Sequence, residues 1–323
     1  MKRVLITGGA GFIGSAVVNQ LKSRDKYKIR IADNLSKESS RAIKKSNEVR
    51  GIEFYKVDLT DEREALKVMQ GCEYVIHLAA KIGGIGYFHK YPATIISENN
   101  KINSSVFNAA VKNNVERIVY VSSSMVFESA KRFPSKEEDV CKIPPPKTAY
   151  GFSKLSGEYY CRAYNQEFGL NYTIIRPFNA YGINEYPGEE IGYAHVIPDL
   201  VKKILQEQYP LELLGDGKQI RCFTHVSDVA NGIITAMEKK AGKNEDFNIS
   251  GEEKIRMIDL AKRLWKLCNV KKPFKVKFVP GFEYDIKKRI PSVEKAKKLL
   301  GWEARVKLDD GLKEVVEWLR KEI

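Results

Sequence analysis

The sequence predicts an α/β protein built on a doubly wound parallel sheet, with a smaller α/β lobe towards the C-terminus. Short apolar stretches alternate with amphipathic ones over the first ~120 residues, which is typical of strands joined by crossover helices. The apolar stretches are nearly continuous, as expected of strands that are buried on both faces of a sheet. Beyond residue ~180 the alternation loosens and helices predominate, which favours a second lobe.

The first part of the sheet follows from the order of these stretches. Each expected helix connects two strands, so consecutive strands are expected to be parallel. The helix after the third strand is expected to start at Thr60 or Asp61, because acidic residues follow in its first turn. The expected strands are 3–8, 27–34, 52–59, 74–80 and 117–124, and the expected helices are 12–23, 60–70 and 97–114.

A polar, proline-rich segment over 129–149 interrupts this pattern and is expected to be a long surface loop. We place a first domain at 1–180 and a second lobe mainly at 181–323, with some segments of the lobe returning to the first domain. The later elements are expected to be helices at 149–169, 197–208, 228–241, 255–268, 293–302 and 310–323, strands at 172–179, 247–250 and 274–279, and a loop at 180–194.

The composition is that of an ordinary globular protein and argues against several classes of protein. No apolar run approaches the ~20 residues that a membrane span needs. A secretory leader is not expected, because a strand-like stretch follows Met1 almost at once. The five cysteines are scattered, odd in number and never in C-x-x-C spacing, so we expect reduced thiols, a cytoplasmic location and no metal site.

The net charge of +14 at pH 7 raises the question of an anionic partner. A nucleic acid or a membrane surface would attract such a charge. However, Lys and Glu are interspersed and no arginine-rich arm is present, as in "LKEVVEWLRKEI". An ordinary solvated surface is therefore favoured, and neither a membrane nor a nucleic-acid partner is expected.

A glycine-rich turn follows the first strand, with Gly8, Gly11 and Gly14 spaced G-x-x-G-x-x-G. Gly8 allows a tight turn, Gly11 allows a pyrophosphate to approach the backbone, and Gly14 allows the helix to pack on the sheet. The N-terminal end of that helix would then hold the phosphates of a dinucleotide. The alternative is a tight strand-to-helix turn that binds no ligand.

Acidic residues end the second and third strands. Asp33 lies about 20 residues after the glycines, where a carboxylate accepts hydrogen bonds from ribose hydroxyls and repels a 2′-phosphate, which favours NAD over NADP. Asp58 would accept from the adenine amino group. Each has a structural alternative, since Asp33 could cap a helix beginning in "DNLS" and Asp58 could cap the helix of "TDEREAL".

The segment "AYGFSK" carries the strongest catalytic pattern. Tyr150 and Lys154 are one helical turn apart on the same face. A charged Lys154 would stabilise the phenolate and lower the pKa of Tyr150, so that the tyrosine could exchange a proton with a sugar hydroxyl. The hydroxyls of "SSS" at 122–124 end the fifth strand, which is the edge of the sheet where ligands bind in open α/β folds.

In order along the chain, these motifs resemble the extended short-chain dehydrogenase/reductases, and within them the nucleotide-sugar epimerase/dehydratase group. The resemblance covers nearly the whole chain and implies a Rossmann-type fold, an NAD cofactor, a nucleotide-sugar substrate and a homodimer. The longer first interval between the glycines is usual in this group. The motifs are the glycines at 8–14, "HLAA" at 77–80, Asn99, "SSS" at 122–124, Tyr150 with Lys154, "RPFNAYG" at 176–182, "LGDGKQIRCFTHVSDV" at 214–229 and "VEKAKKLLGW" at 293–302.

The resemblance also implies a role for each matching residue. Tyr150 would be the general base and acid, Lys154 its partner, and Ser123 the catalytic hydroxyl. Asn179 and Arg221 would contact the phosphates of the substrate, although Asn179 could instead satisfy loop backbone and Arg221 could form an ion pair. The remaining expected contacts to the cofactor are Gly8, Gly11, Phe12, Ile13, Gly14, Asp33, Asn34, Asp58, Leu59, Leu78, Ala79, Ala80, Asn99, Ser122 and Pro177, and those to the substrate are Lys81, Ser124, Met125, His195, Val196 and Arg289.

Departures from the family patterns discriminate between reactions. The 4,6-dehydratases have an acidic pair after the catalytic hydroxyl, where this chain has Ser124 and Met125, so dehydration is not expected. The segments "AAKIGGIG" and "AHVIPDL" are similar to those of GDP-fucose synthase, in which the matching histidine, here His195, works with a cysteine. GDP-mannose 3,5-epimerases also have a cysteine there, and Met125 cannot move protons.

The favoured reaction is therefore that of the UDP-glucose 4-epimerases, which need only the Ser, Tyr, Lys set and a tightly held NAD. A UDP-hexose is favoured over a GDP-sugar. The alternatives are a GDP-sugar 3,5-epimerase or a 4-keto-sugar epimerase/reductase of the GDP-fucose synthase type. A non-catalytic NAD-binding protein with an RNA or protein partner is a further alternative, supported only by the charge.

Overall fold

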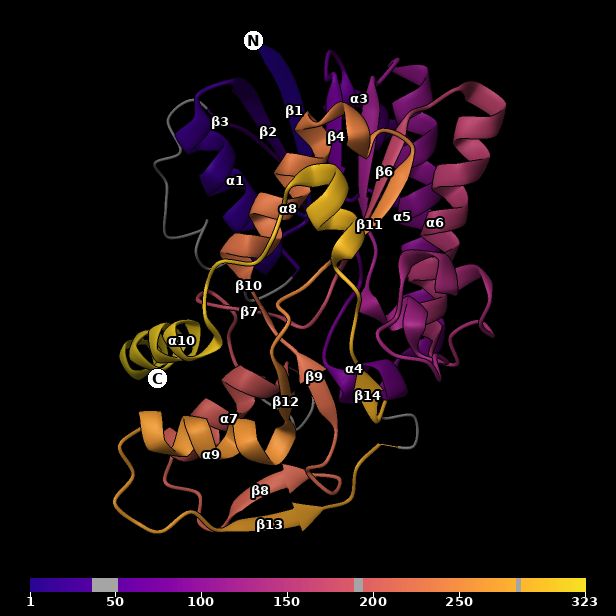
Figure 1. Cartoon of the computed structure of the whole chain (residues 1–323). Helices are drawn as coiled ribbons and strands as arrows, with labels where there is room; N and C mark the ends of the chain where they lie inside the picture. The colour runs from indigo at the N-terminus through magenta and orange to yellow at the C-terminus, as the bar shows by residue number, and fades with distance from the viewer. Residues whose placement is uncertain (37–51, 189–193, 283–285) are drawn as a thin grey trace.

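A computed structural model describes residues 1–36, 52–188, 194–282 and 286–323. Its centre is a seven-stranded parallel sheet with the strand order β11-β6-β5-β4-β1-β2-β3 (Figure 1). The strands are β1 (Lys2–Thr7), β2 (Tyr27–Asp33), β3 (Ile52–Lys56), β4 (Tyr74–His77), β5 (Arg117–Val121), β6 (Tyr172–Pro177) and β11 (Glu245–Ile249). The predicted fold class, a doubly wound α/β fold with a parallel sheet, is confirmed.

Helices cover both faces of this sheet, because neighbouring residues of each strand point to opposite sides. Val4 and Ile6 of β1 pack towards one face, and Leu5 packs into a separate core on the other face. The first face is covered by α1 (Phe12–Arg24) and α8 (Val226–Glu238), and the second by α3 (Glu62–Met69), α5 (Pro92–Lys112) and α6 (Ala149–Phe168). The buried faces explain why the strands are apolar almost throughout.

A smaller lobe lies below the sheet in the view of Figure 1 and has a core of its own. That core joins α7 (Val196–Leu205), α9 (Met257–Leu267) and α10 (Leu308–Glu322). Short sheets complete the lobe and its junction with the large sheet. Their strands are β7 (Ala180–Tyr181) with β10 (Thr224–His225), β8 (Leu211–Leu214) with β13 (Val276–Val279), and β9 (Ile220–Cys222) between β12 (Lys254–Arg256) and β14 (Lys288–Arg289).

Several elements from the second half of the chain pack with the large sheet rather than in the lobe. β11 pairs with β6 at the edge of the sheet, and α8 packs in the core beneath it. The predicted domain division at 180 and 181, with some later segments returning to the first domain, stays a prediction.

Several elements differ from the sequence-based expectations in extent. α5 begins at Pro92 rather than at 97, because proline suits the first turn of a helix, where its missing N–H is not needed. The expected loop at 129–149 contains a short 3-10 helix, η3 (Glu137–Cys141). The expected helix at 293–302 contains a five-residue π-helix, η5 (Ala296–Leu300). The short elements α4 (Ile85–Lys90), η2 (Ser124–Phe127) and η4 (Lys240–Gly242) were not predicted.

Candidate active site

The glycine turn between β1 and α1 has the shape that a bound pyrophosphate requires. Gly8 has φ +70, and a Cβ there would lie 2.7 Å from the backbone nitrogen of Ala79. A Cβ on Gly14 would lie 2.2 Å from the carbonyl oxygen of Gly8, so only glycine lets α1 approach the turn this closely. Gly11 is the N-cap of α1, and no side chain caps it. These features fit the phosphates of a dinucleotide at the N-terminal end of the helix.

Asp33 ends β2 beside this turn and stabilises it directly. Its Oδ2 accepts a hydrogen bond from the backbone N–H of Ala10 at 3.0 Å, and its Oδ1 accepts from the N–H of Leu35 at 2.8 Å. Burial raises the pKa of Asp33, and the two backbone hydrogen bonds oppose that rise. No helix begins directly after Asp33, because residues 34–36 are not helical and Leu35 has φ +58, so the capping alternative for Asp33 is wrong.

Asp58 does not cap the helix that follows it. Its Oδ1 accepts from the N–H of Thr60, whereas the N-cap of α3 is Asp61, which accepts from the N–H of Arg63 at 2.8 Å. The capping alternative for Asp58 is therefore wrong, and the predicted start at Thr60 or Asp61 is confirmed. Asp58 lies on the wall of the cleft described next.

One cleft of about 1120 Å³ runs from the glycine turn to the smaller lobe. It lies at the carboxyl ends of the parallel strands, where open α/β sheets bind their ligands. Every predicted site residue except Asn99 lines it, namely Gly8, Gly11, Phe12, Ile13, Gly14, Asp33, Asn34, Asp58, Leu59, Leu78, Ala79, Ala80, Lys81, Ser122, Ser123, Ser124, Met125, Tyr150, Lys154, Pro177, Asn179, His195, Val196, Arg221 and Arg289.

Asn99 lies behind the wall of the cleft, which differs from the predicted direct contact with the cofactor. Its side chain is 3% exposed, and its Oδ1 accepts from the N–H of Lys81 at 2.6 Å. Its Nδ2 donates to the carbonyl oxygen of Lys81 and to Ser153. These bonds use both protons of the amide group, so Asn99 positions the backbone of Lys81 instead of reaching into the cleft.

The Ser, Tyr and Lys of the catalytic pattern meet at one point of the cleft. α6 begins at Thr148, whose hydroxyl accepts from the N–H of Gly151, and this cap places Tyr150 in the first turn. Ser123, which follows the end of β5, is near the hydroxyl of Tyr150 and lowers its pKa. The Nζ of Lys154 donates to the carbonyl oxygen of Val121 at 2.9 Å and so fastens α6 to the end of β5.

Burial governs the pKa values of Tyr150 and Lys154. Burial raises the pKa of Tyr150, while the polar side chain of Ser123 and the charge of Arg289 oppose the rise. Burial lowers the pKa of Lys154 to about 8. The predicted lowering of the tyrosine pKa by Lys154 is therefore not seen in this structure, because the phenol lies in an apolar site and the ammonium is directed at a carbonyl oxygen.

Apolar side chains surround Tyr150, and of these the sequence singled out only Met125. The ring of Phe88, on α4, stacks on Tyr150 with the ring centroids 4.5 Å apart and the planes at 8°. Met125, Ile82 and Ile286 join the same cluster. These segments are distant along the chain, and no local pattern marks their contact.

Arg221 and Arg289 are in register on neighbouring parallel strands, β9 and β14, and both line the cleft. Nη1 of Arg289 lies 3.4 Å from the hydroxyl of Ser124 and 3.3 Å from Oδ1 of Asn179, and Nη2 lies 2.8 Å from the sulfur of Met125. Asn179 also donates to the carbonyl oxygen of Cys222, so it supports the backbone in addition to lining the cleft. Two guanidinium groups side by side suit a diphosphate.

His195 is the N-cap of α7, and its Nδ1 forms an ion-pair contact with Glu185. Sequence reasoning missed Glu185, which lies in the segment expected to be loop and is buried beside the histidine. Lys81, near the other end of the wall, pairs with Glu98 at 3.4 Å. Among the described residues no group of three His, Cys, Asp or Glu side chains could hold a metal ion, and no described helix could span a membrane.

The chain was compared with known proteins, and several match it over nearly their whole length. A UDP-N-acetyl-alpha-D-glucosaminuronate decarboxylase from Bacillus cytotoxicus is 33% identical over 99% of this chain and 98% of its own. GDP-mannose 3,5-epimerase 1 from Oryza sativa subsp. japonica is 30% identical over 99% of this chain and 82% of its own. These relatives catalyse different reactions at similar identity.

A solved structure of UDP-glucose 4-epimerase from Thermotoga maritima, with UDP-glucose, has the same fold. It superposes with a TM-score of 0.87 at 33% identity and covers 99% of both chains. The sequence profile of the NAD dependent epimerase/dehydratase family matches residues 4–250. The glycine turn, Asp33 and the Ser123, Tyr150 and Lys154 set, together with these matches, show that the chain is an enzyme of the NAD-dependent epimerase/dehydratase family, with NAD as its cofactor and a nucleotide sugar as its substrate.

Proposed function

We propose that the protein is a UDP-hexose 4-epimerase of the UDP-glucose/UDP-galactose type. The observation that carries the proposal is the meeting of Ser123, Tyr150 and Lys154 in the cleft that begins at the glycine turn. NAD held by the glycine turn and Asp33 would supply the hydride acceptor and donor that the reaction needs at C4 of the sugar. The residues of this chain therefore have to exchange one proton at O4 and hold the sugar while it turns.

The proton at O4 is assigned to Tyr150. Ser123 and Tyr150 line the same part of the cleft, so a sugar hydroxyl placed there would contact both groups. A lysine whose pKa is about 8 is largely charged at neutral pH. We assign to Lys154, one helical turn from Tyr150 on α6, the charge that would stabilise the phenolate once the proton has been transferred. Exclusion of water by Phe88 and the apolar cluster strengthens this electrostatic effect.

The diphosphate of the substrate is assigned to Arg221 and Arg289. Both lie on the wall at the lobe side, and their position on adjacent strands allows two planar donors to face one anion. The side-chain amide of Asn179, a residue with φ +41, lies beside Arg289 on this wall of the cleft. The sugar would then extend from the arginines towards Tyr150.

Met125 favours a reaction at one carbon of the sugar, C4, over proton exchange at C3 or C5. Its sulfur contacts Arg289 and its side chain packs in the apolar cluster, at the position after Ser124 where an acid or base would be needed to remove a proton from C5. A thioether neither gives nor accepts a proton. Neither dehydration nor a two-step exchange at C3 and C5 is therefore supported by this side of the cleft.

One observation favours the alternative reaction, a GDP-sugar 3,5-epimerase or a 4-keto-sugar epimerase/reductase. His195 lines the cleft and is paired with Glu185, as an imidazole that moves a proton next to a ketone would be. This arrangement supplies one acid/base group from the lobe. In the 4-epimerase proposal His195 contacts the substrate and exchanges no proton with it.

We also propose a homodimer formed through α6, since its large aromatic side chains Phe152, Tyr159 and Phe168 are exposed. A cytoplasmic location is proposed from the free state of all five cysteines. Analytical ultracentrifugation of the wild type tests the dimer. A Tyr159→Glu variant that stays dimeric would exclude α6 as the contact.

The reaction is tested with UDP-, GDP- and dTDP-hexoses incubated without added reductant, with the products identified by NMR. The expected result is conversion of UDP-glucose and UDP-galactose into each other by the wild type, and none by Tyr150→Phe, which should still bind NAD. Conversion of GDP-mannose at C3 or C5 supports the alternative, and conversion of a 4-keto sugar only with NAD(P)H indicates a reductase. Steeply salt-dependent RNA binding without turnover would favour a non-catalytic protein.

A further inference from the structure

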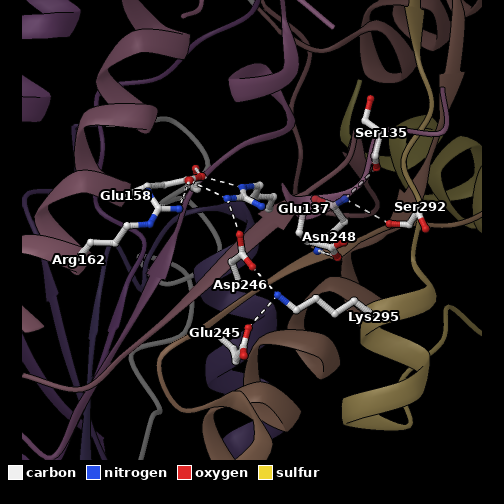
Figure 2. Close-up of polar contacts among 11 residues, drawn as sticks. Ser135, Glu137, Glu158, Arg162, Glu245, Asp246, Asn248, Ser292 and Lys295 are labelled. Carbon is white, nitrogen blue, oxygen red and sulfur yellow. Dashed lines mark hydrogen bonds and ion pairs between the residues drawn. The ribbon is translucent and has the colours of Figure 1, made fainter. Parts of the chain in front are cut away.

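We infer that Asp246 and Asn248, two residues of β11, are positioning residues that fix where Arg289 lies in the cleft. They do so by anchoring the segment 290–295, which follows Arg289 directly. The inference rests on the proposed function, because the place of Arg289 affects turnover only if Arg289 contacts the substrate. Figure 2 shows the polar contacts of this region.

Asn248 fastens two segments from distant parts of the chain to the edge of the large sheet. Its Nδ2 donates to the carbonyl oxygens of Ser135 and Ser292, each at 3.2 Å, and its backbone N–H donates to Glu137 at 2.9 Å (Figure 2). Ser135 and Ser292 are also joined to each other, since the N–H of Ser292 donates to the carbonyl oxygen of Ser135 at 2.8 Å. Asn248 is fully buried, so no water replaces these bonds.

Asp246 holds the next part of the same segment by charge. It lies two residues before Asn248 in the strand, so both side chains are on one face of the sheet. Its Oδ1 accepts from Nζ of Lys295 at 2.5 Å, and Lys295 also pairs with Glu245 at 2.8 Å (Figure 2). Although burial raises the pKa of Asp246, Arg176 and Lys295 hold it below its ordinary value, so the carboxylate is charged.

The second carboxylate oxygen of Asp246 is connected through Arg176 to α6, the helix that carries Tyr150. Its Oδ2 lies 2.8 Å from Nη2 of Arg176, a fully buried side chain of β6. Arg176 donates two hydrogen bonds of 2.7 Å to Glu158 of α6, and Glu158 accepts a third from the hydroxyl of Ser122. Ser122 precedes Ser123, and Glu158 is one helical turn after Lys154.

One connected set of buried polar contacts therefore holds both sides of the reaction centre. On one side Glu158 and Ser122 fix the end of β5 and the helix that carries Tyr150. On the other side Asn248 and Asp246 fix the segment that delivers Arg289 to Ser124, Met125 and Asn179. A closely packed interior changes between distinct arrangements and does not deform gradually. Loss of the contacts made by Asn248 or Asp246 is therefore expected to displace Arg289 relative to Tyr150.

Lys295→Met tests the inference with little risk to folding, because the Lys295 side chain is 27% exposed. The KM for UDP-glucose is expected to rise about fivefold or more, which is a usual size of effect for residues in one contact network. The affinity for NAD should not change. Lys295→Arg should restore most of the loss. Lys297→Met is the matched control, since Lys297 lies two residues further on and pairs only with the exposed Glu252 in the contacts described. Equal KM values for the Lys295→Met and Lys297→Met variants would overturn the inference.

A double-mutant cycle shows whether the effect acts through Arg289. In an Arg289→Gln background the Lys295→Met change should raise KM no further, because the group that it positions has already been removed. Effects of the two changes that multiply independently would mean that Lys295 acts by another route and would contradict the inference.

A readout without turnover separates this inference from the proposed function. Phenylglyoxal modifies arginines, and peptide mass spectrometry gives the rate at Arg289 in each protein. The rate should rise severalfold in Lys295→Met and in Asn248→Ala and stay unchanged in Lys297→Met. If the wild type converts no nucleotide sugar, the proposed function fails, while this rate still decides the positioning: an unchanged rate in both variants refutes it.

Discussion

Lys154 should lower the stability of the fold at neutral pH, and Lys154→Met should reveal that cost. The side chain is 6% exposed, and burial lowers its pKa from 10.5 to about 8. A shift of this size corresponds to about 3 kcal/mol of destabilisation wherever the lysine is charged in both the folded and the unfolded chain. Met retains the apolar stem and removes the charge.

The expected difference in stability follows from two opposing contributions. Removing the charge stabilises the fold by about 3 kcal/mol at pH 7, and losing the hydrogen bond to the carbonyl oxygen of Val121 costs about 2 kcal/mol. Lys154→Met should therefore be about 1 kcal/mol more stable than the wild type at pH 7, and inactive. The gain in stability comes at the expense of function.

The difference in stability between the variant and the wild type depends on pH. The folded-state pKa of Lys154 lies below the unfolded value, so between about 8 and 10.5 the unfolded chain binds more protons and the wild type gains stability as pH rises. The variant lacks this titration. Its advantage should vanish and become a deficit of about 2 kcal/mol near pH 10.5, where Lys154 carries little charge in the fold.

Urea unfolding of both proteins at several values from pH 7 to pH 10.5 measures this difference directly. Titration of the tyrosines affects both proteins alike and cancels in the comparison. Lys112→Met, which removes an exposed ion pair with Glu62, is the matched control and should change stability by less than about 1 kcal/mol. A stability difference between Lys154→Met and wild type that does not change with pH would refute the reasoning.

Two further changes test the cofactor end of the cleft. Asp33→Ala should weaken NAD binding and lower the preference for NAD over NADP about tenfold or more, because it removes the carboxylate that repels a 2′-phosphate. Asp33→Asn, which can still accept a hydrogen bond from the N–H of Ala10, should lose the preference but keep more of the affinity for NAD. Fluorescence titration measures both affinities. Gly14→Ala should abolish NAD binding, since its Cβ would lie 2.2 Å from the carbonyl oxygen of Gly8. Gly169→Ala, where nothing lies within 4 Å of the added Cβ, should cost about 1 kcal/mol and leave NAD binding intact; equal NAD affinity in both glycine variants would contradict this account of the turn.

The sequence was most informative where a motif is local. The glycine turn, the acid that ends β2 and the Tyr150 and Lys154 pair each lie within a few residues of a strand or helix end. Their geometry is set by that junction, so spacing alone predicts which atoms face the carboxyl edge of the sheet. The same holds for Asp61, whose role as a cap depends only on its neighbours.

The parts that the sequence did not predict depend on contacts between distant segments. Phe88 stacks on Tyr150 across a separation of more than sixty residues, and Glu185 reaches His195 from a segment without regular pattern. Asn99 belongs to a family motif, but only the fold shows that its amide is used on the backbone of Lys81.

The pKa of Tyr150 illustrates the same limit in energetic terms. Spacing places a lysine one turn away, which by itself would lower the tyrosine pKa. Burial acts in the opposite direction and is larger here, and the extent of burial depends on Phe88 and Met125, which come from other elements. A local charge pattern therefore does not determine the sign of the shift.

The most direct test of the central claim is the fate of the hydrogen at C4. Wild-type protein is incubated with UDP-glucose that carries deuterium at C4, and the UDP-galactose formed is examined by NMR and mass spectrometry. Because Tyr150 exchanges only the proton on O4, the account predicts that the product retains the deuterium at C4 and gains none from solvent at C3 or C5. Loss of the C4 deuterium to water, or solvent hydrogen appearing at C3 or C5, would contradict it.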